Sequence, residues 1–254
     1  MMSPNGARDC IDLNADLGEG IGDDAALLGF VSSANIACGF HAGGPDAMST
    51  AFADARAKGV AVGAHPGYAD RANFGRIAVP MTASGVERLV AYQTGAACSL
   101  AVLAGHRITY VKAHGALYNL AATDTDVARA IARGIRAADP GLVSLCLAGS
   151  AGAGAMADEG LRVAAEVFAD RAYLPDGRLV PRHMPDAMIY DAQTITTRAL
   201  QMLQDRAITT VDGTRRPVQI DSICLHGDTP GAVALAGALR TGLIAAGWQI
   251  AAFA

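Results

Sequence analysis

Short apolar segments recur along this 254-residue chain, and nearly every one ends in polar, ionisable side chains. The segments are 11–13, 33–37, 60–64, 109–111, 163–165 and 220–225, and the polar residues around their ends include Asn14, Asp16, Glu19, His41, His65, Lys112, His114, Tyr118, Glu166, Asp170, Arg171, His226 and Asp228. In a barrel of parallel strands, the carboxyl ends of all strands meet on one face, where barrel enzymes keep their active sites. The repeated pattern therefore predicts an enzyme whose polar residues converge on one site.

The alternation of strand-like and helix-like segments predicts an α/β fold, a single (β/α) barrel domain over 1–254 with seven or eight strands. Strands are expected near 10–16, 32–37, 60–64, 108–113, 142–147, 162–168, 218–225 and 248–253. Helices are expected near 23–30, 45–58, 82–104, 124–138, 186–204 and 230–246, with one more led into by the glycine-rich segment 149–154. An open doubly wound sheet alternates in the same way, but it places its site in one crevice. Polar residues after so many consecutive strands favour the closed barrel.

Two connections are longer than usual for a compact domain, and both are rich in proline and glycine. They cover 66–81 and 170–185. We expect these loops to act as lids or as partner-binding surfaces.

The composition excludes several classes of protein. With 52% hydrophobic and 17% charged residues, the chain can bury a large core, which argues against disorder. A net charge of -4 and a pI near 5.8 give no basic footprint for nucleic acid. The five cysteines are far apart and include no CxxC pair, which argues against a disulfide framework or a cysteine-rich zinc site. No signal-peptide or membrane-span pattern occurs, so we expect a cytoplasmic protein.

Asn14 and Asp16 are two residues apart in the first expected strand, so their side chains point to the same face. Asp16 could be a general base, a metal ligand or a charge anchor. Alternatively, Asp16 and Glu19 could only cap the next helix. We favour a functional role, because burying a carboxylate without a partner is costly.

His41 and His65 lie in two similar segments, HAGGPD and HPGYAD, at the ends of neighbouring strands. Adjacent imidazoles suit proton transfer near neutral pH or metal ligation. With Asp16 they form a candidate metal site of one carboxylate and two imidazoles. We predict these three residues as the centre of water activation, and the alternative is a pair of hydrogen-bonded structural histidines.

Lys112 and His114 share one face of the fourth strand, and Tyr118 follows one helical turn later. Lys112 could hold a phosphate or carboxylate as a point charge. It could also be a buried lysine that pairs with Asp16 or Glu166.

The later strand ends supply further candidates. Glu166 is a candidate catalytic acid, and Arg171 could either bind a carboxylate or only clamp the loop 170–185. His226 and Asp228 add another imidazole and another acid. The predicted substrate- or phosphate-binding residues are Asn14, Glu19, Lys112, His114, Tyr118, Arg171, His226 and Asp228.

Nucleotide-binding signals are weak. No GxxxxGK[ST] pattern occurs, and the glycine-rich segment 149–154 could cradle phosphate at a helix start only as a weak possibility in so glycine-rich a chain.

Six stretches together resemble the LamB/YcsF family, the A subunits of prokaryotic 5-oxoprolinases. They are DLNADLGEG (12–20), ANIACGFHAGGPD (34–46), GAHPGYADRANFGR (63–76), VKAHGALYN (111–119), EVFADRAYLPDGRLVPR (166–182) and ICLHGD (223–228). Each stretch alone is not specific, but the combination is. Ala113 stands where the family usually has proline.

The resemblance implies a barrel of the glycoside hydrolase/deacetylase type. It also implies ATP-dependent hydrolysis of 5-oxo-L-proline to L-glutamate, with ATP as co-substrate, Mg²⁺ expected, and subunits B and C as partners. A His or Asp would activate water, and Arg171 or Lys112 would hold the substrate carboxylate or the phosphate. The resemblance leaves open which subunit binds ATP, whether the chain holds a divalent metal and whether it forms a homo-oligomer.

Two other classes of function are compatible with the pattern. One is a metal-dependent, deacetylase-like hydrolase of sugars or amides. The other is a non-catalytic subunit that only orders its partners.

Overall fold

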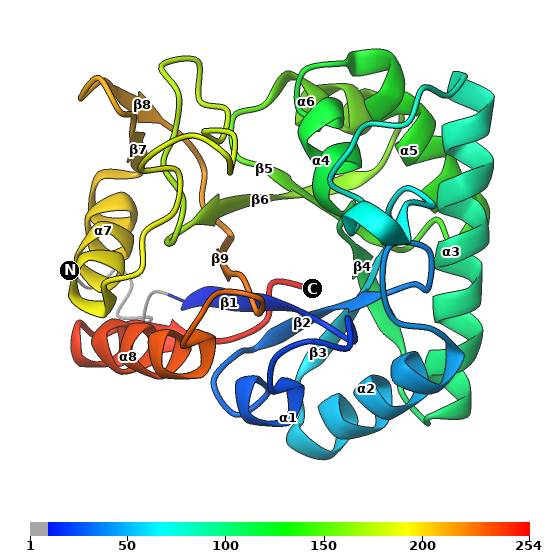
Figure 1. Cartoon of the computed structure of the whole chain (residues 1–254), viewed down its shortest axis with the longest axis horizontal. Helices are drawn as coiled ribbons and strands as arrows, with labels where there is room; N and C mark the ends of the chain where they lie inside the picture. The colour runs from blue at the N-terminus through cyan, green and yellow to red at the C-terminus, as the bar shows by residue number, and fades with distance from the viewer. Residues whose placement is uncertain (1–9) are drawn as a thin grey trace.

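The fold is a closed barrel of seven parallel strands, as the alternation predicts (Figure 1). The computed structural model describes residues 10–254. The barrel strands are β1 (Cys10–Leu17), β2 (Ser33–Ala37), β3 (Ala61–His65), β4 (Ile108–Val111), β5 (Val143–Leu147), β6 (Arg162–Phe168) and β9 (Ser222–Leu225). Each strand pairs with the next in this order, and β9 pairs with both β6 and β1, which closes the ring.

Helices cover the outside of the barrel. They are α1 (Asp24–Leu27), α2 (Pro45–Lys58), α3 (Ala83–Leu103), α4 (Gly115–Ala121), α5 (Thr125–Ala138), α6 (Ala151–Asp158), α7 (Ala192–Asp205) and α8 (Ala232–Ala245), with a 3-10 turn at Arg71–Asn73. In Figure 1, α3 and α5 lie on one side of the barrel and α7 and α8 on the other. Within residues 10–254, no helix has both the length and the apolar character needed to cross a membrane.

Capping by neighbouring residues sets the helix ends at which structure and sequence prediction agree most closely. The hydroxyl of Thr82 accepts a hydrogen bond from the Gly85 N–H at the start of α3. Gly59 ends α2 in a left-handed conformation with φ of 66°, which glycine adopts at little cost. Capping and chain reversal use only neighbouring residues, so the sequence alone predicts them correctly.

The helix expected from 186 begins six residues later, at Ala192. Asp186 has φ of 59°, and the N–H of Ile189 donates to the carbonyl of Asp170, so this segment folds back along the start of its own loop. Asp191 then caps α7 by accepting from the Thr194 N–H. Residues 186–191, which the helical pattern predicts as helix, therefore belong to the second long loop.

Three other elements differ from the expectation. The helix α4 was not predicted, and neither was the small antiparallel hairpin of β7 (Ala207–Thr209) and β8 (Arg215–Pro217). The final strand β10 (Gln249–Ile250) pairs with the first residues of β1 and adds to the barrel without being one of its seven strands.

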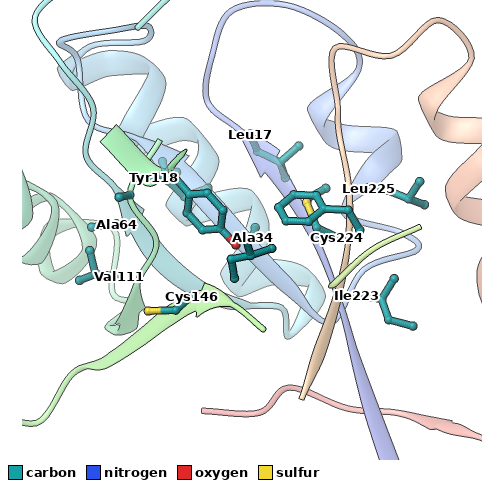
Figure 2. Packing of buried hydrophobic residues seen from close by; sticks show 14 of the residues in the cluster. Leu17, Ala34, Ala64, Val111, Tyr118, Cys146, Ile223, Cys224 and Leu225 are labelled. Atoms are coloured by element: carbon teal, nitrogen blue, oxygen red, sulfur yellow. The ribbon is translucent and has the colours of Figure 1, made fainter. Parts of the chain in front are cut away.

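Apolar side chains at alternate strand positions pack between the barrel and its helices. Leu13, Ile36 and Ile223 belong to this large buried cluster, part of which Figure 2 shows. A second, smaller cluster holds Tyr110 with Val143, Leu145 and Ala164, and Phe253 packs against it.

The ring of Tyr110 fits because β3 has a glycine beside it. A Cβ atom on Gly63 would lie 2.4 Å from the Tyr110 ring. The Phe253 ring lies 4.9 Å from that of Tyr110, and β10 pairs with the start of β1, so the last residues pack at the amino-terminal end of the barrel. The opposite end is left to polar side chains.

Asp12 is a buried carboxyl group below that polar end. It accepts hydrogen bonds from Ser32 Oγ at 2.6 Å, from Ser33 Oγ at 2.7 Å and from Ser222 Oγ. Burial raises the pKa of Asp12 to about 6, although the three hydroxyls lower it in part.

We predict that replacing Asp12 by Asn changes the pH dependence of stability. The folded state binds the Asp12 proton more tightly than the unfolded chain, so the wild type loses this stabilisation as the pH rises through about 6. The unfolding free energy of the wild type, minus that of Asp12→Asn, should fall by about 2 kcal/mol between about pH 4.5 and pH 7. Denaturant titrations at several pH values measure this difference, and a constant difference would contradict the prediction.

Candidate active site

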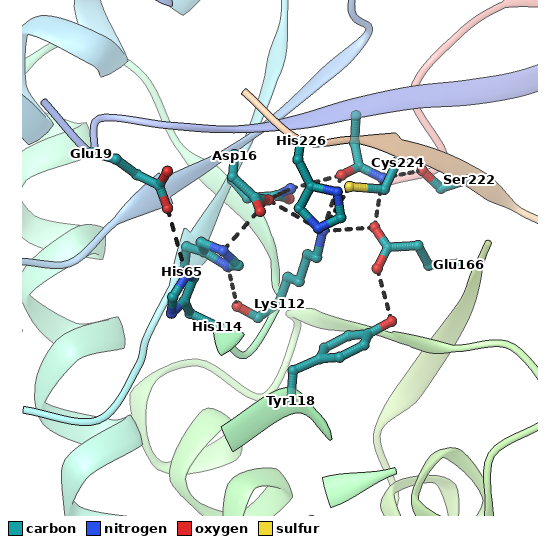
Figure 3. Close-up of polar contacts among 12 residues, drawn as sticks. Asp16, Glu19, His65, Lys112, His114, Tyr118, Glu166, Ser222, Cys224 and His226 are labelled. Atoms are coloured by element: carbon teal, nitrogen blue, oxygen red, sulfur yellow. Dashed lines mark hydrogen bonds and ion pairs between the residues drawn. The ribbon is translucent and has the colours of Figure 1, made fainter. Parts of the chain in front are cut away.

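The carboxyl ends of the barrel strands carry a layer of polar side chains (Figure 3). Six residues predicted from the sequence meet there, and each is at least nine-tenths buried: Asp16, His65, Lys112, His114, Glu166 and His226. His41 lies in the same layer, and its ring is stacked on that of His114. The structure therefore brings together side chains from β1, β3, β4, β6 and β9 and from the connection after β2.

Lys112 is the only positive side chain in direct contact with the two central carboxylates within residues 10–254. Its Nζ lies 3.2 Å from Asp16 Oδ1 and 2.8 Å from Glu166 Oε1. Burial alone would raise the pKa of Asp16, but the charge of Lys112 holds it well below its usual range. Burial would lower the pKa of Lys112, but the charges around it, that of Asp16 first, raise it well above its usual value. Lys112 is therefore an internal counter-ion with little charge left for a ligand.

Two amides hold the carboxylates in place. Asn35 Nδ2 donates to Asn14 Oδ1 at 2.7 Å and to Asp16 Oδ1 at 2.8 Å. Asn14 Nδ2 donates to Glu166 Oε1 at 2.8 Å. The hydroxyl of Tyr110 donates to Asn35 Oδ1 at 2.7 Å, which fixes the orientation of that amide. Tyr110, which belongs to the smaller apolar cluster, thus orients the amides that hold the carboxylates.

Tyr118 extends this network from α4. Its hydroxyl donates to Glu166 Oε2 at 2.8 Å, so both oxygens of Glu166 have partners. Glu166 is fully buried and does not line the cavity. Glu166 is therefore placed to hold Lys112 and Tyr118.

Three imidazoles gather beside Asp16 and Glu19. The rings of His41 and His114 are parallel with centroids 3.7 Å apart, and the His65 ring stands edge-on to both. Glu19 Oε1 lies 3.5 Å from His41 Nε2 and 3.7 Å from His114 Nε2.

The electrostatics of this group follow from burial. Burial lowers the pKa of His41 to about 3 and also lowers that of His114, so both rings are neutral near pH 7. Burial raises the pKa of Glu19 to about 9, and the charges of Asp16 and Asp228 add to this effect.

A separate acid–imidazole pair joins the ends of β6 and β9. His226 Nδ1 lies 2.8 Å from Asp170 Oδ2, and the His226 backbone N–H donates to the same oxygen at 3.2 Å. A carboxylate can only accept, so Nδ1 carries the proton, and in the neutral ring Nε2 has the lone pair. Burial would raise the pKa of Asp170, but the charge and hydrogen bonds of His226 hold it below its usual value. This pair has the form of an oriented general base.

These groups open into a cavity of about 500 Å³. Of the predicted residues, its lining includes Asp16, Glu19, His65, Lys112, His114, Tyr118, Arg171, His226 and Asp228. Asn14 and Glu166 lie behind the wall, where they hydrogen-bond other residues of the site, and His41 lies behind it stacked on His114.

Arg171 clamps its own loop, which is one of the two roles that the sequence left open. Its Nη2 donates to the carbonyl of Val180 at 2.6 Å, which clamps the second long loop. Its Nε is buried without a hydrogen-bond partner, and the residue lines the cavity. Burial and the charge of Arg182 lower the pKa of Arg171 to about 10, so it remains a cation at neutral pH.

Asp228 ties the two long loops together over the cavity. It pairs with Arg76 from the first loop and with Arg182 from the second, whose Nη1 lies 3.1 Å away. Both arginines line the cavity. The loops therefore form its rim, and Asp228 acts as their shared anchor.

The residues predicted from the sequence do not include Asn35, Tyr110, Ser222, Arg76 or Arg182. Strand alternation could have found Asn35, which lies on the same face of its strand as Ser33 and Ala37. The two rim arginines carry no local signal, because their partner Asp228 is distant in the sequence.

The chain is similar to known proteins over nearly its whole length. A sequence model of the LamB/YcsF family matches residues 11–254. A protein of Azorhizobium caulinodans, named as the A subunit of 5-oxoprolinase, is 54% identical, over 96% of this chain and 98% of its own length. A protein of Mycobacterium avium with the same name is 50% identical, over 96% and 98%.

Solved structures agree on the architecture. The lactam utilization protein of Thermus thermophilus superposes with a TM-score of 0.90 at 41% identity, over 96% of this chain and 99% of that one. The peptidoglycan deacetylase PdaC of Bacillus subtilis has a TM-score of 0.50 at 12% identity, over 99% and 90%, which shows a shared fold alone.

We predict that replacing Lys112 by Met lowers the unfolding free energy by about 3–5 kcal/mol, because it leaves Asp16 and Glu166 as uncompensated buried charges. The other lysine, Lys58, is exposed on α2 and supplies the control. Lys58→Met should change stability by less than about 1 kcal/mol. Chemical denaturation measures both values, and equal losses would contradict the prediction.

Proposed function

This chain belongs to the LamB/YcsF family, and we propose that it is the A subunit of a 5-oxoprolinase, a hydrolase that opens the cyclic amide 5-oxo-L-proline to L-glutamate. The observation that carries the proposal is the near-full-length similarity to proteins that bear this name. The cavity adds chemical support, because such a reaction needs a cation for the substrate carboxylate and a base for water.

Arg171 is the residue best placed to hold the substrate carboxylate. Lys112 is already neutralised by Asp16 and Glu166, whereas the Nε of Arg171 has no partner. A guanidinium is well suited to bind a carboxylate through paired N–H groups. Arg182 lies at the same wall and adds positive charge there.

His226 is the residue best placed to activate water. Its Nδ1–H is held by Asp170, and its Nε2 is free to take a proton. Water would attack the lactam carbon as its proton moves to His226. The ring C–N bond would then break, with that proton passing to the leaving nitrogen. Asp16 is less suited to this role, because Lys112 holds it as a stable anion, and His41 does not line the cavity.

ATP would make the amide reactive. We propose that the γ-phosphoryl group is transferred to the lactam oxygen, giving ADP and an activated carbon. Attack by the first water with cleavage of the ring C–N bond would leave an acyl phosphate of glutamate, and a second water would hydrolyse it to glutamate and phosphate. Overall, 5-oxoproline, ATP and two water molecules would yield glutamate, ADP and phosphate. Mg²⁺ would accompany the nucleotide.

We place nucleotide binding on a partner, with subunits B and C as the proposed partners. The names of the relatives denote one subunit of 5-oxoprolinase, which supports a complex of several chains. The glycine-rich segment at the start of α6 lacks the lysine of the P-loop motif. Its Ser150 hydroxyl caps the helix by accepting from Ala153 N–H.

We expect the purified chain alone to release little or no glutamate from 5-oxo-L-proline and ATP. Addition of subunits B and C should give glutamate and ADP in equal amounts. Both products can be measured in one reaction by chromatography. ATP-coupled turnover by this chain alone at the rate of the full complex would refute the division of labour.

Within that complex, we predict that Asp170→Asn lowers kcat by about 10²-fold or more, because the oriented base loses its anionic partner. KM for 5-oxoproline should change only a few-fold, since Asp170 does not face the substrate. Asp124→Asn is the matched control, because Asp124 caps α5 and asparagine caps a helix equally well. A kcat for Asp170→Asn equal to that of the control would remove His226 from the role of base.

A further inference from the structure

Three side chains at one wall of the cavity, and His41 behind it, carry buried polar atoms without a hydrogen-bond partner. The atoms are Glu19 Oε1, both ring nitrogens of His41, His65 Nε2 and His114 Nδ1. Buried polar atoms are almost always paired, so a cluster of unpaired ones requires an explanation. We propose that Glu19, His65 and His114 bind a divalent transition-metal ion such as Zn²⁺.

The spacing of the ligand atoms fits one ion. Glu19, His65 and His114 offer ligand atoms that lie within 4.8 Å of one another. Glu19 Oε1 is 3.7 Å from His114 Nε2, which is the nitrogen offered as a ligand and is not the unpaired Nδ1. Ligands about 2.1 Å from a tetrahedral zinc ion lie about 3.4 Å apart, so the atoms are close to coordination distance. Figure 3 shows these three side chains gathered on one side of Asp16.

His65 is held in the tautomer that metal binding requires. Its Nδ1 lies 2.7 Å from the backbone carbonyl of Lys112. A carbonyl only accepts, so Nδ1 carries the proton and Nε2 presents its lone pair to the site. A hydrogen bond of this kind, from the ring nitrogen that does not bind the ion, is the usual partner of a metal-binding histidine.

The lone pair of His65 also faces a carboxylate. Its Nε2 lies 3.4 Å from Asp16 Oδ1, and in the neutral ring these two atoms are both acceptors. A cation between or beside them removes this repulsion. Ordinary charged hydrogen bonds do not explain the distances, because such bonds are about 2.7–2.9 Å long.

A second group of possible ligands, Asp16, Cys224 and His226, is less suitable. Lys112 Nζ lies 3.2 Å from Asp16 Oδ1 and 3.2 Å from Cys224 Sγ. The ammonium already supplies the positive charge there, and a divalent ion would be repelled by it.

The proposed set differs from the candidates Asp16, His41 and His65 suggested by the sequence. Glu19 and His114 line the cavity, so an ion between them could reach a ligand, whereas His41 lies behind the wall and stacks on His114. Asp16 accepts from Asn35 and pairs with Lys112, so it flanks the ion with its charge. Two imidazoles and a carboxylate suit zinc and its first-row neighbours. Such an ion supplies a Lewis acid at the cavity wall.

The test measures metal binding by the full chain without substrate, so its outcome is independent of the proposed function. After removal of metals with a chelator, the wild type should bind about one Zn²⁺ per chain by calorimetry and elemental analysis. Zn²⁺ should also raise its Tm, because the ion binds the folded state. The Co²⁺ form should show a visible spectrum without a thiolate charge-transfer band.

Glu19→Gln and His114→Gln should each weaken Zn²⁺ binding by more than the roughly 10–100-fold that changes to the partners of metal ligands cost. His106→Gln is the control, since His106 Nε2 pairs with the carbonyl of Val60 outside the cavity. The Tm of each metal-free protein shows whether it is folded. If one of the two ligand variants does not fold, the other still tests the proposal. Substoichiometric binding by the wild type, unchanged binding in both ligand variants, or a loss confined to Cys224→Ser would overturn the proposal.

Discussion

The buried ammonium of Lys112 is the charge on which the interior of the barrel depends. It lies between Asp16 and Glu166, which come from strands distant in the sequence, and Asn14 bridges the same groups. Either the cation or the carboxylates alone would be strongly disfavoured in this interior. The ion pairs therefore fix the relative positions of β1, β4 and β6 at their carboxyl ends, and the amides of Asn14 and Asn35 are arranged around them.

In the half of the barrel near the carboxyl ends of its strands, polar side chains point inward and apolar side chains point outward. Apolar residues such as Leu13 and Ile223 pack outward beneath the helices, while Asn14, Asn35 and Ser222 fill the interior with hydrogen bonds. This arrangement is stable only if each buried polar group has a partner. Among residues 10–254, the largest group of neighbouring unpaired atoms lies at Glu19 and the histidines beside it, and a local departure of this kind is expected at a functional site.

The site is completed by segments that belong to no strand. Asp228 holds Arg76 and Arg182, and thereby joins the two long loops across the cavity mouth. The fold thus separates two tasks. The strand ends hold the ionic centre and the oriented His226, whereas the loops supply the cationic rim that a substrate carboxylate would meet.

The sequence by itself determined the barrel, the face on which its site lies and most of the side chains that converge there. Hydrophobic alternation and helix capping are local, so Thr82, Gly59 and the strand-end positions of Asp16 and His65 could be recognised without coordinates. Only the tertiary structure decided the partners: Asp170 with His226, Glu19 with His114, and Asp228 with the two rim arginines. It also kept 186–191 out of α7. These pairings depend on strand register and on loops returning to the barrel, and that information is shared among residues far apart in the chain rather than present in any one segment.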